Sequence, residues 1–167
     1  MSIRLMSHNH QWGQEFLQSR SMLFYATDGW LNEVRHIGGT ALPEMVTQPV
    51  IDMLAGMEDI RGLNAAAELI EGLNYQRTPS PEWCQNELVA MLQKPRVGEP
   101  THTVLIARKD GPVWQHCLAV QEFLGKNLAE RQRFENLKRD HFQPGCAAEQ
   151  EYAIAKSRYF HELAQRI

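Results

Sequence analysis

The chain has 167 residues, of which 43% are hydrophobic and 22% charged, and its formal net charge at pH 7 is −3. This composition is typical of one globular domain, and it excludes a disordered chain, a collagen-like repeat and a disulfide scaffold. The acidic balance argues against non-specific binding to nucleic acid. Because no apolar run approaches the ~20 residues of a bilayer span and the first ten residues lack the apolar core of a secretory signal, we expect a cytoplasmic protein without a membrane anchor.

Hydrophobic spacing predicts the elements of the first half of the chain. Apolar residues four and seven positions apart predict a helix over about 10–29. Two short strands are expected next, at 31–39, where two glycines end the run, and at 49–55, an apolar run broken by one aspartate. Apolar residues three and four apart then predict a helix over about 60–70, and a proline-rich turn follows around 78–81.

The second half begins with strands and ends with helices. Strands are expected at 87–93 and 101–107, joined as a hairpin by a loose loop that contains glycine and proline. From about residue 112 onward, helical spacing continues to the end of the chain, with a proline–glycine break at 144–145. The order of elements predicts an α+β or mixed α/β domain, in which helices pack on one face of a small mixed sheet.

One stretch has features suited to binding a phosphate and a metal ion. Gly38 and Gly39 follow a predicted strand, so the backbone can approach a ligand closely, and free N–H groups up to Thr40 can face a phosphate. Asp52 lies within an apolar strand and points to the opposite face from its apolar neighbours. Mg²⁺ is commonly held by one or two carboxylates together with substrate phosphates. The alternatives are an ordinary turn and an aspartate exposed at the end of a strand.

Several runs of sequence resemble the GrpB family along nearly the whole chain. The run His-Ile-Gly-Gly-Thr-Ala-Leu-Pro at 36–43 and the run Gln-Pro-Val-Ile-Asp-Met-Leu at 48–54 resemble its signature. Thr-His-Thr at 101–103, Leu-Lys at 137–138 and Tyr-Ala-Ile-Ala-Lys at 152–156 resemble later family motifs. The resemblance implies one domain over residues 1–167, helical from about 112, with the DNA polymerase β-like fold of the nucleotidyltransferase superfamily.

The resemblance also implies an activity and a set of site residues. In that superfamily, two carboxylates hold metal ions that bridge the phosphates of a nucleoside triphosphate and activate the hydroxyl of an acceptor. Here the acceptor is unknown. The implied site residues are Asp52, for Mg²⁺ and catalysis, and, for contacts with phosphate and nucleotide, Gly38, Gly39, Thr40, His102 and Lys156. We expect His102 on the same sheet face as Asp52; the alternatives are a half-exposed strand histidine and, for Lys156, a solvated helical lysine.

The sequence departs from the family pattern at the positions that matter most for transfer. Leu54 occupies the position of the second metal carboxylate, Gln48 replaces the usual lysine, and Gln121-Glu122 replaces Arg-Asp. The first hypothesis is therefore a nucleotidyltransferase, and the second is a non-catalytic nucleotide-binding or regulatory domain. A third is a protein-docking surface on the helical region 112–167, and a homo-oligomer is compatible with the sequence. Whether another acid replaces the missing ligand stays open; the candidates are Glu58, Asp59 and Glu87.

Overall fold

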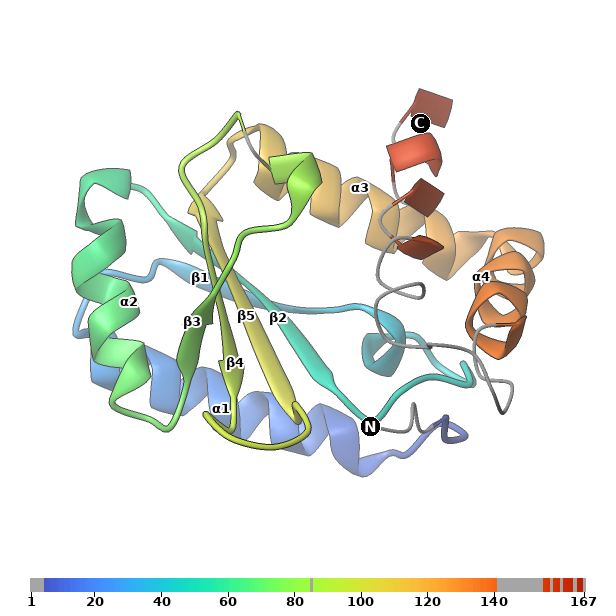
Figure 1. Cartoon of the computed structure of the whole chain (residues 1–167), viewed down its shortest axis with the longest axis horizontal. Helices are drawn as coiled ribbons and strands as arrows, with labels where there is room; N and C mark the ends of the chain where they lie inside the picture. Colours follow the sequence, from blue (N-terminus) through green and yellow to red (C-terminus); the bar gives the residue numbers. More distant parts are fainter. Residues whose placement is uncertain are drawn as a thin grey trace.

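The fold is built around one five-stranded sheet, shown in Figure 1. The computed structural model describes residues 5–84 and 86–140, together with 155, 156, 158, 159, 161–163, 165 and 166. The strands are β1 (Glu33–Ile37), β2 (Ile51–Met57), β3 (Gln76–Thr78), β4 (Ala90–Lys94) and β5 (His102–Arg108). The helices are α1 (Gln11–Thr27), α2 (Leu63–Glu71), α3 (Pro112–Lys126) and α4 (Leu128–Asp140), and three short 3₁₀ turns cover Gly39–Ala41, Ile60–Gly62 and Glu82–Cys84.

The sheet is mixed, with the order β1-β2-β5-β4-β3. The central strands β2 and β5 are parallel, and the other neighbours are antiparallel. The expected hairpin between the two later strands is present as β4 and β5. The edge strand β3, just before the predicted turn at 78–81, was not expected, because its three residues are too few to show a periodic pattern. The α+β class predicted from the sequence is confirmed.

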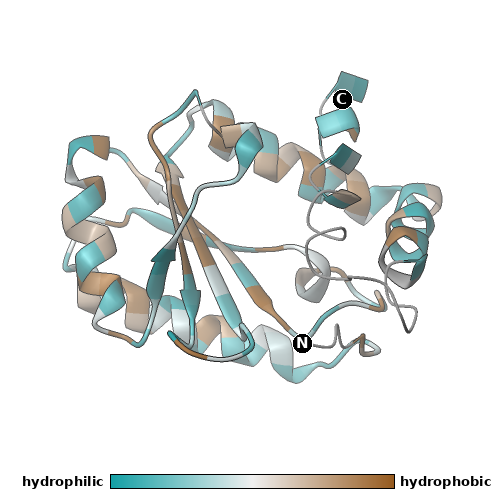
Figure 2. Ribbon diagram, viewed as in Figure 1, coloured by the Kyte–Doolittle hydropathy of each residue, from teal (hydrophilic) through white to brown (hydrophobic). Residues whose placement is uncertain are grey.

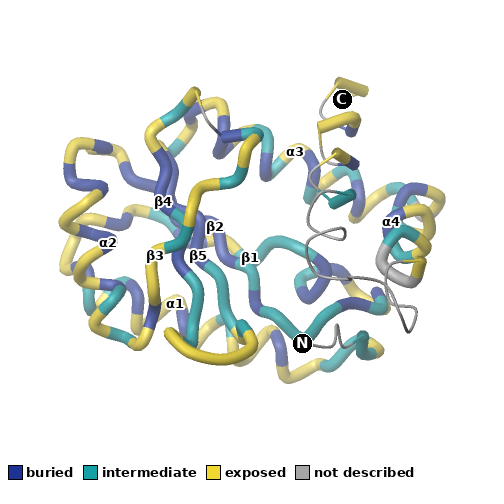
Figure 3. The backbone as a smooth tube through the Cα atoms, in the orientation of Figure 1, coloured by how far each residue is buried: buried dark blue, intermediate teal, exposed yellow. Residues whose placement is uncertain are grey.

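Helices cover both faces of the sheet, so the expectation of helices on one face is wrong. Alternate residues of β2 point to opposite sides. Ile51 and Met53 belong to the core beneath α1 and α2, whereas Leu54 belongs to the core beneath α3. Central strands need apolar cover on both sides, and Figures 2 and 3 show these strands as hydrophobic and buried in the middle of the molecule.

A third core joins the C-terminal helices to the loop that precedes β2. It contains Leu42 and Met45 from that loop, residues of α3 and α4, and Tyr159 and Leu163 from the C-terminal helical segment. Buried Glu130 of α4 accepts a hydrogen bond from the Tyr159 hydroxyl at 3.1 Å and forms an ion pair with Arg166 at 2.6 Å. These contacts fix the path of the chain between the glycine pair and Asp52.

The predicted C-terminal helices are only partly covered by the structure. The helical run expected from about 112 is divided into α3 and α4, and residues 155–166 are helical wherever they are described. The predicted break at 144–145 and the first three residues of the 152–156 motif lie outside the described residues. In the described part of the chain, no helix has the length and apolar character that a membrane span requires.

Candidate functional site

The pairing of β1 with β2 brings the glycine turn against Asp52. Ile37, the last residue of β1, is the register partner of Asp52, so Gly38 follows directly beside the aspartate. Gly38 has a φ of +76°, which favours glycine. A Cβ built at this position would overlap the Asp52 carboxylate oxygen Oδ2. Glycine is therefore required both by the backbone conformation and by the close approach of the carboxylate.

The Asp52 carboxylate is held from the neighbouring strand by Thr103. The two residues are register partners in the parallel pair β2 and β5, and the Thr103 hydroxyl donates to Asp52 Oδ1 at 2.6 Å. Asp52 is half-buried and points to the opposite face from Ile51 and Met53, as its strand position predicted; the structure shows that α3 covers this face. This places an oriented carboxylate beside the glycine turn, with Oδ2 directed at Gly38.

The backbone of Gly38 already has a hydrogen-bonding partner, the side chain of Gln121 on α3. The Gly38 N–H donates to Gln121 Oε1 at 2.8 Å, and Gln121 Nε2 donates to the Gly38 carbonyl at 3.3 Å. The expectation that this N–H is free for a phosphate is therefore wrong for the structure as it stands. Any phosphate on Gly38 N–H has to displace the Gln121 amide.

Gly39 and Thr40 pack into the protein. A Cβ at Gly39 would overlap the Thr47 hydroxyl. Thr40 is 2% exposed, and its hydroxyl donates to the Val50 carbonyl at 3.0 Å. Because the Thr40 hydroxyl is used inside the protein, it does not face a ligand; its observed contacts stabilise the turn.

His36 completes this internal network on the other face of the sheet, where it stacks on Phe16 of α1 with ring centroids 4.9 Å apart. Burial lowers the pKa of His36 to about 4, although the Asp52 charge acts in the opposite direction. Its Nε2 lies 2.9 Å from the Thr40 hydroxyl, whose proton is directed to a carbonyl. His36 is therefore neutral, and its Nε2–H donates to Thr40.

The structure separates His102 from the turn. His102 is the register partner of Ile51, one residue before the Thr103–Asp52 pair, so its side chain points to the opposite face. Its Nδ1 is 2.8 Å from the Thr101 hydroxyl, and burial together with the Lys94 charge lowers its pKa. The expectation that His102 shares a face with Asp52 is wrong, because a shift of one residue reverses the direction of a strand side chain.

Lys156 lies half-buried in the C-terminal helical segment, one turn before Tyr159. Its contact with a nucleotide stays a prediction.

Comparison with known proteins establishes the family. A family model described as GrpB protein matches residues 2–166. The chain belongs to the GrpB family. The glutamate-rich protein GrpB of Alkalihalophilus pseudofirmus is 20% identical over 160 residues, which cover 95% of this chain and 92% of that protein. A UPF0157 protein of Halalkalibacterium halodurans is 23% identical over 166 residues, 99% of this chain and 82% of that one.

The fold is also that of a solved GrpB structure. The crystal structure of conserved protein GrpB from Enterococcus faecalis matches with a TM-score of 0.79 at 22% identity, over 98% of both chains. The resemblance noted in the sequence motifs is thus confirmed at the level of family and fold.

In this member of the GrpB family, Asp52 lacks a second carboxylate at the position where the nucleotidyltransferase pattern that the sequence resembles has one. Leu54 points to the same face as Asp52 but is fully buried in the core beneath α3. Glu58 lies six residues further along the chain from Asp52, about 20 Å for an extended strand. Asp59 is paired with Arg61 at 2.9 Å, and Glu87 lies in a pocket beside the far end of β5. These three acids therefore do not replace the missing ligand.

The residues present suit one metal ion better than two. Within the described residues, no group of three or more His, Cys, Asp and Glu side chains is arranged to hold a metal. Mg²⁺ that keeps several water ligands and is shared with phosphates needs only one or two carboxylates. Asp52 meets that lower requirement, whereas a two-metal site would need further acids.

Sequence reasoning missed Thr103 as a partner of Asp52 and missed the contact between Gln121 and Gly38. Thr103 adjoins His102 in the Thr-His-Thr motif, so the motif located the right strand but the wrong side chain. Gln121 stood out only as a departure from the family pattern. Its contact with a residue 83 positions earlier depends on how α3 docks on the sheet.

Proposed function

We propose that this GrpB-family protein binds a nucleoside triphosphate through one Mg²⁺ held by Asp52, and that it does not transfer the nucleotidyl group. The observation that carries the proposal is the contact between Asp52 and Gly38, in which an oriented carboxylate lies against a turn that tolerates no side chain. The carboxylate that would hold the ion therefore lies next to the glycine backbone that would contact the phosphates once Gln121 is displaced.

Binding is supported by the way Asp52 is held. Thr103 uses only part of the acceptor capacity of the carboxylate, because an ionised carboxylate offers about four lone-pair positions. The side chain is half-buried, so the carboxylate keeps access to solvent. Mg²⁺ bound here would offset the negative charge of Asp52 and of the phosphates. Gln48, which stands where the family usually has lysine, is uncharged and cannot offset that charge.

The absence of transfer is inferred from Leu54. Two-metal transfer requires ligands that hold a second ion at the attacking oxygen, and leucine provides none. Gln121 bears on affinity instead: a phosphate that binds the Gly38 N–H has to displace two hydrogen bonds, so binding is expected to be weak. A single weakly held ion favours binding without chemistry. The competing transferase hypothesis makes Asp52 the catalytic residue.

In the described part of the helical region, no exposed large apolar side chain supports the docking hypothesis. In the described residues, the exposed large apolar side chains all precede residue 100, and they are Leu17, Met22, Tyr25, Trp30, Leu69, Leu88 and Val97. None of them belongs to 112–167.

Calorimetric titration with ATP and Mg²⁺ tests the proposal. We expect Mg²⁺-dependent binding by the wild type and a loss of at least about tenfold in affinity for Asp52→Asn, which keeps the shape but removes the charge. Asp28→Asn is the matched control, because Asp28 is exposed and has a left-handed backbone conformation that asparagine also adopts.

A parallel assay measures pyrophosphate release in the presence of nucleotide and candidate acceptor hydroxyl compounds. We expect none above background. Release that depends on Asp52 would establish the transferase instead, whereas no Mg²⁺-dependent ATP binding by the wild type would contradict both hypotheses.

A further inference from the structure

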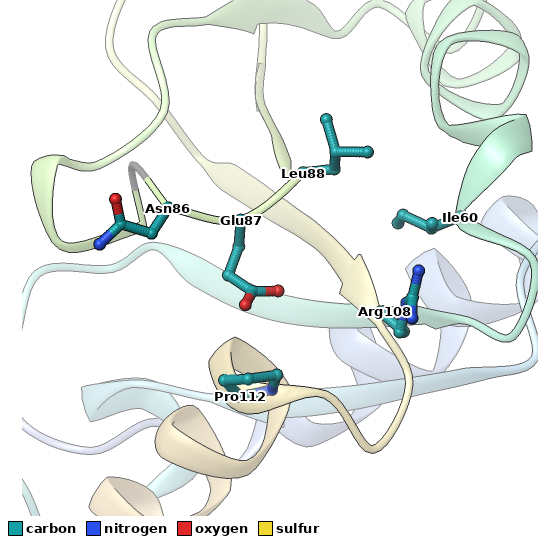
Figure 4. Close-up of a pocket in the computed structure, with 6 residues that line it drawn as sticks. All are labelled: Ile60, Asn86, Glu87, Leu88, Arg108 and Pro112. Carbon is teal, nitrogen blue, oxygen red and sulfur yellow. The ribbon is translucent and has the colours of Figure 1, made fainter.

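A second candidate site lies at the opposite end of the sheet from Asp52. A cavity of about 280 Å³ opens beside the carboxyl end of β5, between the start of α3 and the loop that leads into β4. Its lining residues are Ile60, Asn86, Glu87, Leu88, Arg108 and Pro112, drawn in Figure 4. The carboxyl ends of parallel strands are a favoured place for ligands in sheets with helices on both faces, and β2 and β5 form the parallel pair here.

The cavity presents two opposite charges that are not used elsewhere. Within the described residues, the side chains of Arg108 and Glu87 form no hydrogen bond or ion pair with each other or with other side chains. Two cations near the cavity are paired: Arg61 with Asp59 at 2.9 Å, and Lys109 with Glu33 at 4.0 Å. An unpaired guanidinium and an unpaired carboxylate in one cavity can each take a group of the opposite charge.

Apolar side chains form the remaining walls. Ile60 is 6% exposed and gives a fixed surface, whereas Leu88 is 67% exposed at the rim. Figure 4 shows Glu87 extending toward Pro112 at the start of α3, with Arg108 on the side of Ile60. A ligand between them would therefore contact both charges and cover apolar surface at once.

We propose that this cavity binds a free α-amino acid with an apolar side chain. The ligand carboxylate would contact the Arg108 guanidinium, the ligand ammonium would contact the Glu87 carboxylate, and the side chain would pack on Ile60 and Leu88. The volume of about 280 Å³ lies just below the usual range of small-molecule sites, which suits a ligand as small as an amino acid. The site is separate from Asp52 and does not depend on nucleotide binding.

Methyl NMR of the full chain tests the proposal with leucine as the probe. Saturable shifts of the Leu88 and Ile60 methyl signals are expected. Isoamylamine, which lacks the carboxylate, and 4-methylpentanoate, which lacks the ammonium, should each bind at least about tenfold more weakly, because each loses one charge-assisted contact. Absence of saturable shifts up to the solubility limit of leucine overturns the proposal, and so does equal binding of either analogue.

Two variants test the assigned charges. Arg108→Gln and Glu87→Gln are each expected to lower leucine affinity by at least about tenfold. Arg20→Gln on α1 and Glu68→Gln on α2 are matched controls, because both residues are exposed on helices away from the cavity, and wild-type affinity is expected. Asp52→Asn should also bind leucine normally. Retention of affinity in either cavity variant overturns the two-charge contact.

Discussion

Gln121 and Gly38 are joined by two hydrogen bonds, although 83 positions separate them in the chain. The side-chain amide of Gln121 satisfies both polar groups of a glycine that adjoins Asp52, and so occupies the N–H that the proposed function assigns to a phosphate. This contact ties α3 to the end of β1. Both hydrogen bonds have to break before a phosphate can bind the Gly38 N–H, so the contact lowers the expected affinity of the proposed site.

Removing the Gln121 amide should separate its structural role from its effect on binding. Gln121→Ala is expected to lower the free energy of unfolding by about 1–2 kcal/mol through the loss of two partly buried hydrogen bonds. The same change frees Gly38 N–H, so affinity for ATP with Mg²⁺ should rise. Gln121→Glu keeps an acceptor for that N–H and should show no gain. Urea unfolding and calorimetry measure the two effects, and equal affinity of the two variants would contradict the competition.

A side chain at position 38 should be strongly destabilising. Gly38→Ala places a Cβ against Asp52 Oδ2 and in a left-handed backbone conformation, with an expected cost of at least about 2 kcal/mol in urea unfolding. Gly13→Ala is the matched control. Gly13 lies within α1 with nothing within 4 Å of a new Cβ, so alanine should stabilise the helix by about 0.5–1 kcal/mol. A neutral Gly38→Ala would be inconsistent with the contact.

A second carboxylate cannot be restored by a single substitution at Leu54. Because Leu54 is fully buried beneath α3, Leu54→Asp should lower the free energy of unfolding by more than about 3 kcal/mol. Leu54→Met, which conserves volume, should cost less than about 1.5 kcal/mol. Thermal unfolding followed by circular dichroism ranks the two variants. A stable Leu54→Asp protein with new pyrophosphate release would reverse the conclusion that this position is purely structural.

The stability of the fold should fall in mildly acidic solution because of His36. Its pKa is about 4 in the folded protein against an ordinary value of 6.5, with burial as the main cause. Between these two values the unfolded chain takes up a proton that the native histidine does not, so the free energy of unfolding falls as the pH falls from about 6.5 toward about 4.

His36→Gln isolates this contribution. Glutamine keeps an N–H donor for Thr40 but does not titrate, so its free energy of unfolding should depend less steeply on pH. The lowered pKa values of His102 and His116 contribute equally to both proteins. Urea unfolding at about pH 7.5 and about pH 5 measures the difference. If the free energy of unfolding changed equally with pH in both proteins, the pKa of His36 would not be lowered by folding.

The sequence alone determined the local elements and the direction of Asp52. Alternation along β2 puts Ile51 and Met53 on one face and Asp52 on the other, because side chains of a strand alternate strictly. The glycine pair marked the end of β1 for an equally local reason. Helical spacing located α1, α2 and the start of α3 to within a few residues, but it did not mark the division between α3 and α4.

Only the tertiary structure decided which side chains meet. The register of β5 against β2 assigns Thr103 rather than His102 to Asp52, and a shift of one residue would have reversed that choice. The docking of α3 brings Gln121 to Gly38, and the pairing of β1 with β2 presses Gly38 against the carboxylate. Backbone periodicity is a property of neighbouring residues, whereas these contacts join segments that are distant in the chain and depend on how whole elements pack.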